Sequence, residues 1–221
     1  MKALLLKLSF FEAFFKVHYT KGFRLSYPIP LPPSVAGVFG AFLGIERKSI
    51  LNEAKSMLFG AKLVSYRGIS PENATLLQYK SMGSKPTKTI AYLYVINDPI
   101  YLMAIAGEEN KIEEVREKLE NSVKYLPYGG QNDFFIKDWK FIGLTNVEES
   151  YEISNYAPQD LVETLLKGVE VEILPVRHNF SENPNFYFVI SGSLKLKQKI
   201  PCISNEKIAI YPLEKFFYQI N

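Results

Sequence analysis

Apolar residues in the first quarter of the chain follow a strand pattern and then a helical one. Residues 3–10 are rich in Leu and Phe and alternate loosely, which predicts a buried first strand. After a long loop, a helix is predicted over residues 34–44 with Ser34 as its N-cap, because two prolines disfavour helix before it. A second helical stripe follows and ends at Gly60. We therefore expect two helical segments between the first and second strands.

Strand patterns dominate the next part of the chain. β-branched and aromatic runs predict strands at residues 62–67, 74–79, 89–96 and 99–106. A run of turn formers between the second and third of these strands predicts a hairpin tip. Three lysines lie on this tip: Lys80, Lys85 and Lys88. The sequence therefore predicts a basic β-hairpin.

A helix, a glycine loop and a strand complete this first module. Apolar residues at helical spacing predict a helix over residues 108–123, whose other face carries alternating charges. A glycine loop at residues 128–133 and a strand at residues 140–146 follow. The order of elements resembles the βαββαβ, ferredoxin-like arrangement shared with RNA-recognition modules. We therefore expect an α+β domain over residues 1–147.

The remaining residues, 148–221, predict a smaller and mostly β region. Four apolar residues at helical spacing predict one short helix over residues 158–167, which Gly168 ends. Strand patterns follow at residues 169–174, 186–191, 193–199 and 207–211.

Composition limits the classes of function that the chain can have. It has 221 residues, of which 47% are hydrophobic and 22% charged, and its formal net charge is +3. This charge excludes histone-like binding of nucleic acid but allows a local basic groove. Cys202 is the only cysteine, so an intramolecular disulfide and a cysteine zinc site are excluded, and a reducing cytoplasm fits best. No apolar run reaches the roughly 18 residues that cross a bilayer, so we expect no membrane association.

Three glycines on one face of the predicted helix at residues 34–44 suggest a close contact. Gly37, Gly40 and Gly44 have the spacing i, i+3 and i+7. Each glycine inside a helix costs about 1 kcal/mol relative to alanine, so the pattern suggests that something packs close to this backbone. The free N–H groups at the helix start are also available to a phosphate. The alternative is an ordinary core helix capped by Ser34.

Candidate catalytic groups are sparse. The two histidines, His18 and His178, belong to no recognisable local motif, and no catalytic or nucleotide-binding signature is present. His18 with Tyr19 or Lys21 supplies the acid and base groups that metal-independent RNA cleavage needs. A histidine in a basic loop is, however, more often a nucleic-acid contact. We expect no metal site and no cofactor, and the sequence favours a non-catalytic role.

Binding of RNA has better support in the residue pattern. A loop at residues 16–27 mixes cations, aromatic rings and hydroxyls, which single-stranded RNA recognition uses for phosphates, unstacked bases and polar edges. Its candidate contacts are Lys16, His18, Tyr19, Lys21, Arg24, Ser26 and Tyr27, followed by Ser34 at the predicted helix start. The glycine loop adds backbone that a ligand can approach closely and two amide side chains. Its candidates are Gly129, Gly130, Gln131 and Asn132, although turn formation alone also explains the glycines.

The N-terminal residues resemble the repeat-associated RNA-binding (RAMP) proteins of CRISPR systems, and more narrowly the Cas-five subunit of type I Cascade complexes. The resemblance rests on the first strand, the segment Ser-Tyr-Pro-Ile-Pro-Leu-Pro-Pro-Ser at residues 26–34, the glycine-faced helix and the loop Tyr-Gly-Gly-Gln-Asn-Asp at residues 128–133. It is most specific over residues 1–45 and covers roughly two thirds of the chain.

The resemblance implies a non-catalytic subunit that grips the 5′ handle of the CRISPR guide RNA in antiviral defence. It also implies contacts with the backbone-forming RAMP subunit and the large subunit of the complex. The handle-binding loop would then fall on residues 16–34, the projecting hairpin on residues 80–88 and the glycine-rich loop on residues 129–132. Contacts with other subunits would also cover the aromatic C-terminal residues Phe216, Phe217 and Tyr218.

Two other functions stay open. One branch of the family cuts the precursor RNA with a Tyr and an adjacent Lys-His pair. This chain departs from that pattern, because His18 follows Val17 and His178 follows Arg177. A metal-independent endoribonuclease that processes precursor CRISPR RNA is therefore the alternative. A scaffold whose loops contact only proteins is the third possibility.

Overall fold

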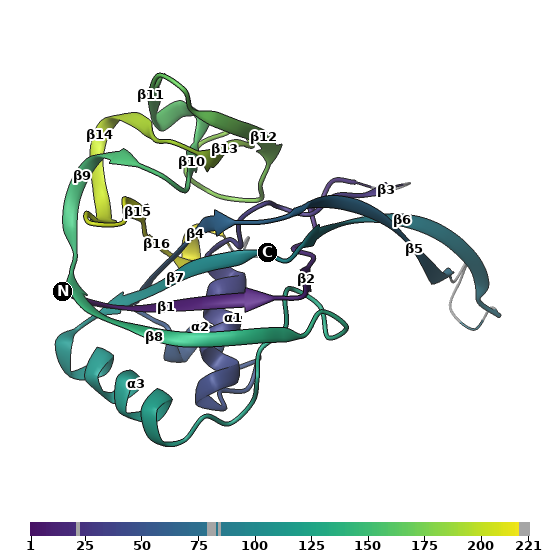
Figure 1. Cartoon of the computed structure of the whole chain (residues 1–221), viewed down its shortest axis with the longest axis horizontal. Helices are drawn as coiled ribbons and strands as arrows, with labels where there is room; N and C mark the ends of the chain where they lie inside the picture. Colours follow the sequence, from purple (N-terminus) through teal and green to yellow (C-terminus); the bar gives the residue numbers. More distant parts are fainter. Residues whose placement is uncertain (21–22, 79–82, 84, 217–221) are drawn as a thin grey trace.

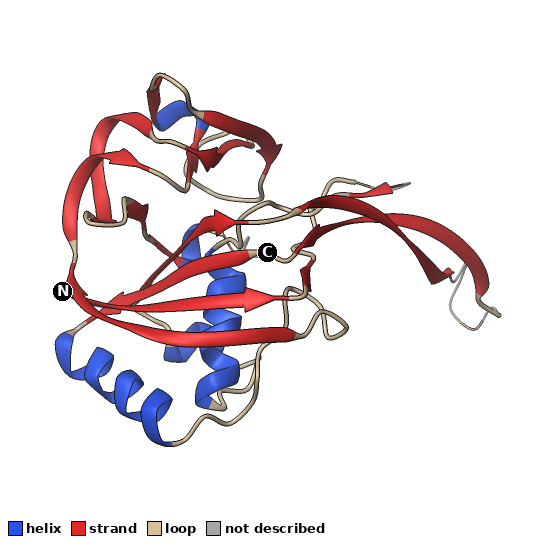
Figure 2. Cartoon of the chain, viewed as in Figure 1, coloured by secondary structure: helices blue, strands red, loops and turns tan. Residues whose placement is uncertain are grey.

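A central antiparallel sheet organises the fold (Figure 1). The computed structural model describes residues 1–20, 23–78, 83 and 85–216. In strand order, the sheet contains β16 (Tyr211–Pro212), β4 (Leu58–Ser65), β7 (Ile100–Gly107), β1 (Lys2–Phe10) and β8 (Ile136–Asn146). Its helices are α1 (Pro32–Leu43), α2 (Ile50–Glu53) and α3 (Glu109–Asn121). Figure 2 shows these helices on one side of the sheet and the C-terminal strands on the other.

Burial on both faces explains why β1 is almost continuously apolar. Leu4, Leu6 and Leu8 are fully buried in the core that α1 and α3 complete. Ala3 and Leu5 point to the opposite face and belong to a second cluster, which is formed with C-terminal isoleucines. A strand that is covered on both faces needs apolar residues at successive positions rather than strict alternation.

A long two-stranded ribbon projects from the end of the sheet (Figure 1). It consists of β5 (Gly68–Gln78) and β6 (Thr87–Asn97), paired antiparallel along their whole length. Two short strands pair with β6: β2 (Glu12–Ala13) at the ribbon base and β3 (Phe23–Arg24) near the middle of β6. A small cluster of Phe14, Leu93, Val95 and Phe134 anchors this base. The hairpin predicted from the sequence is thus present, although Lys80 lies outside the described residues.

The C-terminal region is mostly β, as predicted. One small sheet contains β10 (Tyr156–Pro158), β13 (Asn185–Ser191) and β12 (Glu170–Pro175). The other contains β9 (Glu148–Ile153), β11 (Val162–Leu165), β14 (Leu194–Ile203) and β15 (Ile208–Ala209). Short 3-10 turns lie at Gln159–Leu161 and Leu213–Lys215. In the part of the chain that the structure describes, no helix is both long and apolar enough to cross a membrane.

Two predicted helical segments are wrong. Residues 158–167 form a 3-10 turn and then strand β11, because Val162 and Leu165 pair with Leu196 and Leu194 of β14. The helical stripe predicted up to Gly60 is confined to α2, and Gly60 lies inside β4. A Cβ atom at Gly60 would collide with the Ala209 carbonyl oxygen, so close packing of β4 against the C-terminal strands explains this glycine. In both cases tertiary contacts override the local pattern.

The predicted start of α1 is also wrong. Leu31, not Ser34, is the N-cap, and Pro32 and Pro33 occupy the first two helical positions. Proline has no N–H, and the Ser34 N–H donates to the Leu31 carbonyl at 2.9 Å. The Val35 N–H donates to the same carbonyl at 3.1 Å. The N–H groups of Ser34 and Val35 are therefore not free for the phosphate contact that the sequence left open at this helix start.

Candidate nucleic-acid interface

Hydrogen bonds hold the two ends of the loop at residues 16–27 together. The Val17 N–H donates to the Leu25 carbonyl at 2.9 Å, and the Tyr27 N–H to the Phe15 carbonyl at 2.7 Å. The Ser26 hydroxyl is buried and accepts from the Phe15 N–H at 2.9 Å. The structure thus gives Ser26 a structural role, and Tyr27 is 2% exposed.

Tyr27 ties this loop to the C-terminal region. Its hydroxyl donates to the Pro175 carbonyl at 2.8 Å, and its ring stacks on Phe188 with the centroids 5.4 Å apart. Burial raises the pKa of this phenol. Two residues beyond Pro175, the guanidinium of Arg177 lies 5.6 Å from the centre of the Tyr19 ring. A cation-π contact therefore joins the loop to a segment that is distant in sequence.

The exposed groups of this surface are cations and rings. Lys16, His18, Tyr19 and Arg177 are exposed, and Arg24 is half-buried. Among the residues that the structure describes, Lys16, Arg24 and Arg177 form no salt bridge with a carboxylate. We call Lys16, His18, Tyr19, Arg24 and Arg177 the basic face. Lys21, also predicted here, lies outside the described residues.

Arg177 is the member of the basic face that sequence reasoning missed. It is a single cation in a C-terminal loop, and nothing in its local sequence connects it with Tyr19. The Tyr27–Pro175 hydrogen bond and the stacking of Tyr27 on Phe188 help to bring the two segments together.

His18 and His178 occupy very different environments. Burial, then Arg177 and Lys16, lower the pKa of His18, so its imidazole is neutral at neutral pH. His178 is 3% exposed, its Nδ1 accepts from the Phe180 N–H at 3.1 Å, and its ring packs on Phe186 at 4.9 Å. This burial keeps an RNA strand away from His178 and removes it as a candidate acid–base group.

One face of the projecting ribbon combines a lysine with apolar and aromatic side chains. Lys88, Ile90 and Tyr92 alternate along β6 and are exposed, as is Lys85 near the tip. Phe23 of β3 lies beside this face, with its ring 6.5 Å from that of Tyr94. The alternation of Lys88, Ile90, Tyr92 and Tyr94 was the signal that sequence reasoning left unused.

The glycine loop makes close contacts with its own chain. The Gly129 N–H donates to the Phe134 carbonyl, and the Gly129 carbonyl accepts from the Phe14 N–H, both at 2.7 Å. Gly130 has φ +96°, and a Cβ there would collide with the Phe14 carbonyl oxygen. The close backbone approach that adjacent glycines permit is therefore an approach to Phe14.

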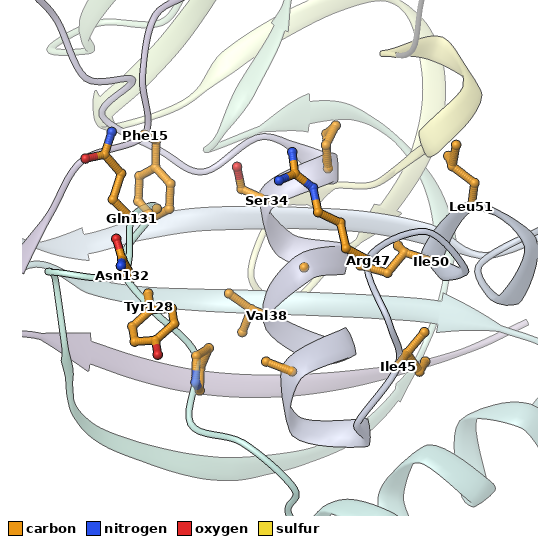
Figure 3. Close-up of a pocket in the computed structure, with 15 residues that line it drawn as sticks. Phe15, Ser34, Val38, Ile45, Arg47, Ile50, Leu51, Tyr128, Gln131 and Asn132 are labelled. Atoms are coloured by element: carbon orange, nitrogen blue, oxygen red, sulfur yellow. The ribbon is translucent and has the colours of Figure 1, made fainter. Parts of the chain in front are cut away.

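A groove of about 650 Å³ lies between α1 and this glycine loop (Figure 3). Ser34, Gly37, Val38 and Ala41 of α1 form one wall, because their spacing puts them on one helix face. The opposite wall comes from the glycine loop and the segment before it: Pro127, Tyr128, Gly130, Gln131 and Asn132. Phe15, Pro33, Ile45, Arg47, Ile50 and Leu51 complete the lining. The structure thus brings Ser34, Gly130, Gln131 and Asn132 together, as a site separate from the basic face.

The described residues contain no cluster of side chains suited to bind a metal ion. Within residues 1–20, 23–78, 83 and 85–216, no three His, Cys, Asp or Glu side chains lie close enough together to hold a metal ion. The buried thiol of Cys202 has a pKa raised to about 12 by burial, then by Glu148 and Glu149. It is therefore a thiol and not a thiolate at neutral pH.

Comparison with solved structures identifies the fold. One similar chain belongs to a structure described as a "CRISPR RNA-guided surveillance complex", with 12% identity, a TM-score of 0.53 and coverage of 97% of this chain and 95% of the other. Another is a CRISPR protein from Archaeoglobus fulgidus, with 13% identity, a TM-score of 0.54 and coverage of 96% and 100%. The chain shares the fold of these CRISPR proteins. No protein-family model and no curated protein matches the sequence.

Proposed function

We propose that this chain is a non-catalytic RNA-binding RAMP subunit of a type I CRISPR surveillance complex. In this proposal it grips the 5′ handle of the guide RNA and contacts the backbone-forming and large subunits. The fold that it shares with two CRISPR proteins supports this assignment over nearly the whole chain. So does the antiparallel order β4-β7-β1-β8 with helices on one face, which is the order of a ferredoxin-like βαββαβ domain. We assign that domain to residues 1–147 and the smaller β region to residues 148–221.

The observation that carries the proposal is the basic face. Arg177 lies over the Tyr19 ring, and Arg177 and Lys16 are both near enough to His18 to lower its pKa. Together with Arg24, these cations have no carboxylate partner among the described residues. Unpaired cations neutralise phosphates, and an exposed ring stacks on an unpaired base. A protein partner with carboxylates would also pair these cations, so the crosslinking experiment below separates the two functions. The ribbon face with Lys88 and Tyr92 extends the same chemistry away from the sheet.

Salt-dependent binding tests this proposal on the full chain. We expect Arg177→Ala to weaken binding of a single-stranded repeat RNA and to lower the slope of log affinity against log salt by about 0.7 per lost phosphate contact. Lys118→Ala is the matched control, because Lys118 is an exposed cation on α3 that is paired with Glu114 at 2.6 Å. Equal slopes for the wild type and Arg177→Ala would remove Arg177 from the RNA contacts. No crosslink to RNA within the assembled complex would favour the scaffold function.

Contacts with other subunits are tested separately. Exposed rings gather at the end of the sheet, where Tyr128 and Phe135 lie 6.1 Å apart and Lys137 is 5.8 Å from the centre of the Phe11 ring. Such rings are typical of interface cores. We expect Phe11→Ser with Phe135→Ser to reduce co-purification with the partner subunits while RNA crosslinking to the basic face persists. Unchanged co-purification would exclude this patch as the docking surface.

One observation supports precursor cleavage as a second candidate. His18 is exposed and held neutral, which is the form that a general base needs. Incubation of the purified chain with repeat RNA in EDTA separates the two functions. Specific cleavage that His18→Ala abolishes would establish the endoribonuclease, and intact RNA would favour the binding function.

A further inference from the structure

The middle of α1 contains a glycine that the fold itself does not need. A Cβ atom at Gly37 would meet no heavy atom within 4 Å, whereas one at Gly40 would lie 3.2 Å from Cδ1 of Ile50. Gly44 has φ +72° and is the left-handed C-cap of the helix. Since glycine inside a helix costs about 1 kcal/mol relative to alanine, contacts within the chain explain the last two glycines but not Gly37. The open space beside Gly37 is the groove of Figure 3.

The chemistry of the lining limits what can occupy this groove. Among the described residues that line the groove, Arg47 is the only charged side chain and none is a carboxylate. Most of the rest is aliphatic or aromatic, with the half-exposed ring of Tyr128 on the wall opposite Val38. A ligand that fits this groove and matches its lining therefore has flat apolar faces and a negative charge.

Two amide side chains add a third requirement. Gln131 and Asn132 line the wall opposite α1, while Arg47 lies on the α1 side (Figure 3). An amide donates and accepts at once, as the edge of a nucleobase does. An aliphatic side chain from a protein partner would leave both amides and the guanidinium without partners, which is unfavourable.

The groove also continues the basic face along the chain. Phe15 lines the groove, and the next residue is Lys16 of the basic face. The groove and the basic face therefore meet at this point of the chain, although their lining residues differ.

We propose that this groove, the α1 slot, binds one nucleobase turned out of a single-stranded RNA. The base lies against the bare backbone at Gly37 and the ring of Tyr128, its edge meets Gln131 and Asn132, and Arg47 neutralises a phosphate. Glycine at position 37 keeps the slot wide enough for the base. This inference rests on the proposed RNA-binding function. It gives Arg47 a role in phosphate binding and Gly37 a role in base binding.

The test combines a slot-filling variant with abasic RNA. Gly37→Leu places a side chain into the slot, and Asn121→Leu, which adds the same side chain on the exposed surface of α3, is the control. The probes are repeat RNAs that carry one abasic site at each position in turn. For the wild type and the control, we expect one position whose abasic substitution weakens binding by about 5- to 150-fold, the range for loss of one stacked base.

We expect Gly37→Leu to bind the intact RNA more weakly by that same factor. An abasic site at that position should not weaken its binding further. Asn132→Ala tests the slot without filling it, and is expected to reduce discrimination among the four bases at the same position. Thermal unfolding establishes that each variant is folded.

Each possible result supports or contradicts one of the two proposals. If neither the wild type nor the control binds RNA, the proposed function fails. If the wild type binds RNA but no abasic position matters, and Gly37→Leu binds equally well, the α1 slot is not a base site while RNA binding stands. If Gly37→Leu keeps RNA binding but loses a protein subunit on co-purification, the slot holds a protein segment and the inference is overturned.

Discussion

Alanine substitution at two glycines that line the α1 slot should change stability in opposite directions. Gly37 lies within α1, and an added methyl group would meet nothing within 4 Å. Gly37→Ala therefore removes the helix penalty of glycine without adding a collision, which should stabilise the fold by about 1 kcal/mol. For a chain of this length, that gain corresponds to a rise in Tm of about 2–4 °C.

Gly130→Ala should do the reverse. Gly130 has a φ of +96°, and a residue with a Cβ atom is strained by about 1–3 kcal/mol in such a conformation. The same Cβ collides with the Phe14 carbonyl oxygen, and relieving such a collision costs about 1–3 kcal/mol more. The sum is a loss of about 2–6 kcal/mol. Gly168→Ala is the control for strain alone, because Gly168 has φ +79° and open space around its Cβ position.

Urea unfolding of the three variants beside the wild type measures these differences. Equal losses in Gly130→Ala and Gly168→Ala would refute the close approach of the glycine loop to Phe14. A loss of stability in Gly37→Ala would refute the open space beside α1, and with it the structural basis of the slot.

Three other predictions concern the C-terminal region. Tyr27→Phe removes the hydroxyl that donates to the Pro175 carbonyl, and urea unfolding should show a loss of about 1 kcal/mol. Asn155→Ala should cost about 2–4 kcal/mol in the same measurement, because the fully buried amide of Asn155 pairs with both the N–H and the carbonyl of Ala209 at 3.0 and 2.9 Å. Burial lowers the pKa of His178, so the unfolded chain takes up a proton below about pH 6.5 that the folded protein resists, and stability falls with pH in that range. His178→Phe should therefore lose less stability between pH 7 and pH 5 than the wild type does; an equal loss would exclude His178 as the source.

Segments whose own pattern matches their final environment could be predicted from the sequence. The strands predicted at residues 3–10, 89–96, 99–106 and 140–146 and the helix at residues 108–123 are confirmed by β1, β6, β7, β8 and α3. In α3, Ile112, Val115 and Leu119 are buried and the charged residues face outward, so its amphipathic pattern was sufficient.

Segments whose partner lies far away in the sequence could not be predicted. The apolar spacing at residues 158–167 fits a helix as well as a strand, and pairing with β14 decides between them. Arg177 follows β12 and reaches Tyr19 through the fold, and no local pattern encodes that contact. For the same reason, the sequence predicted the basic loop and the glycine loop but not the groove between the glycine loop and α1.

The glycines illustrate why position in the fold, rather than residue type, decides a function. The sequence places Gly37, Gly40 and Gly44 on one helix face, and a single close contact would explain all three. In the structure they have three different roles: open space at Gly37, packing on Ile50 at Gly40 and a left-handed cap at Gly44. Gly37 alone of the three carries the helix penalty of glycine without a contact or a backbone conformation in this chain that requires glycine. A binding partner that occupies the open space would recover it, and this makes Gly37 more informative about function than the other two.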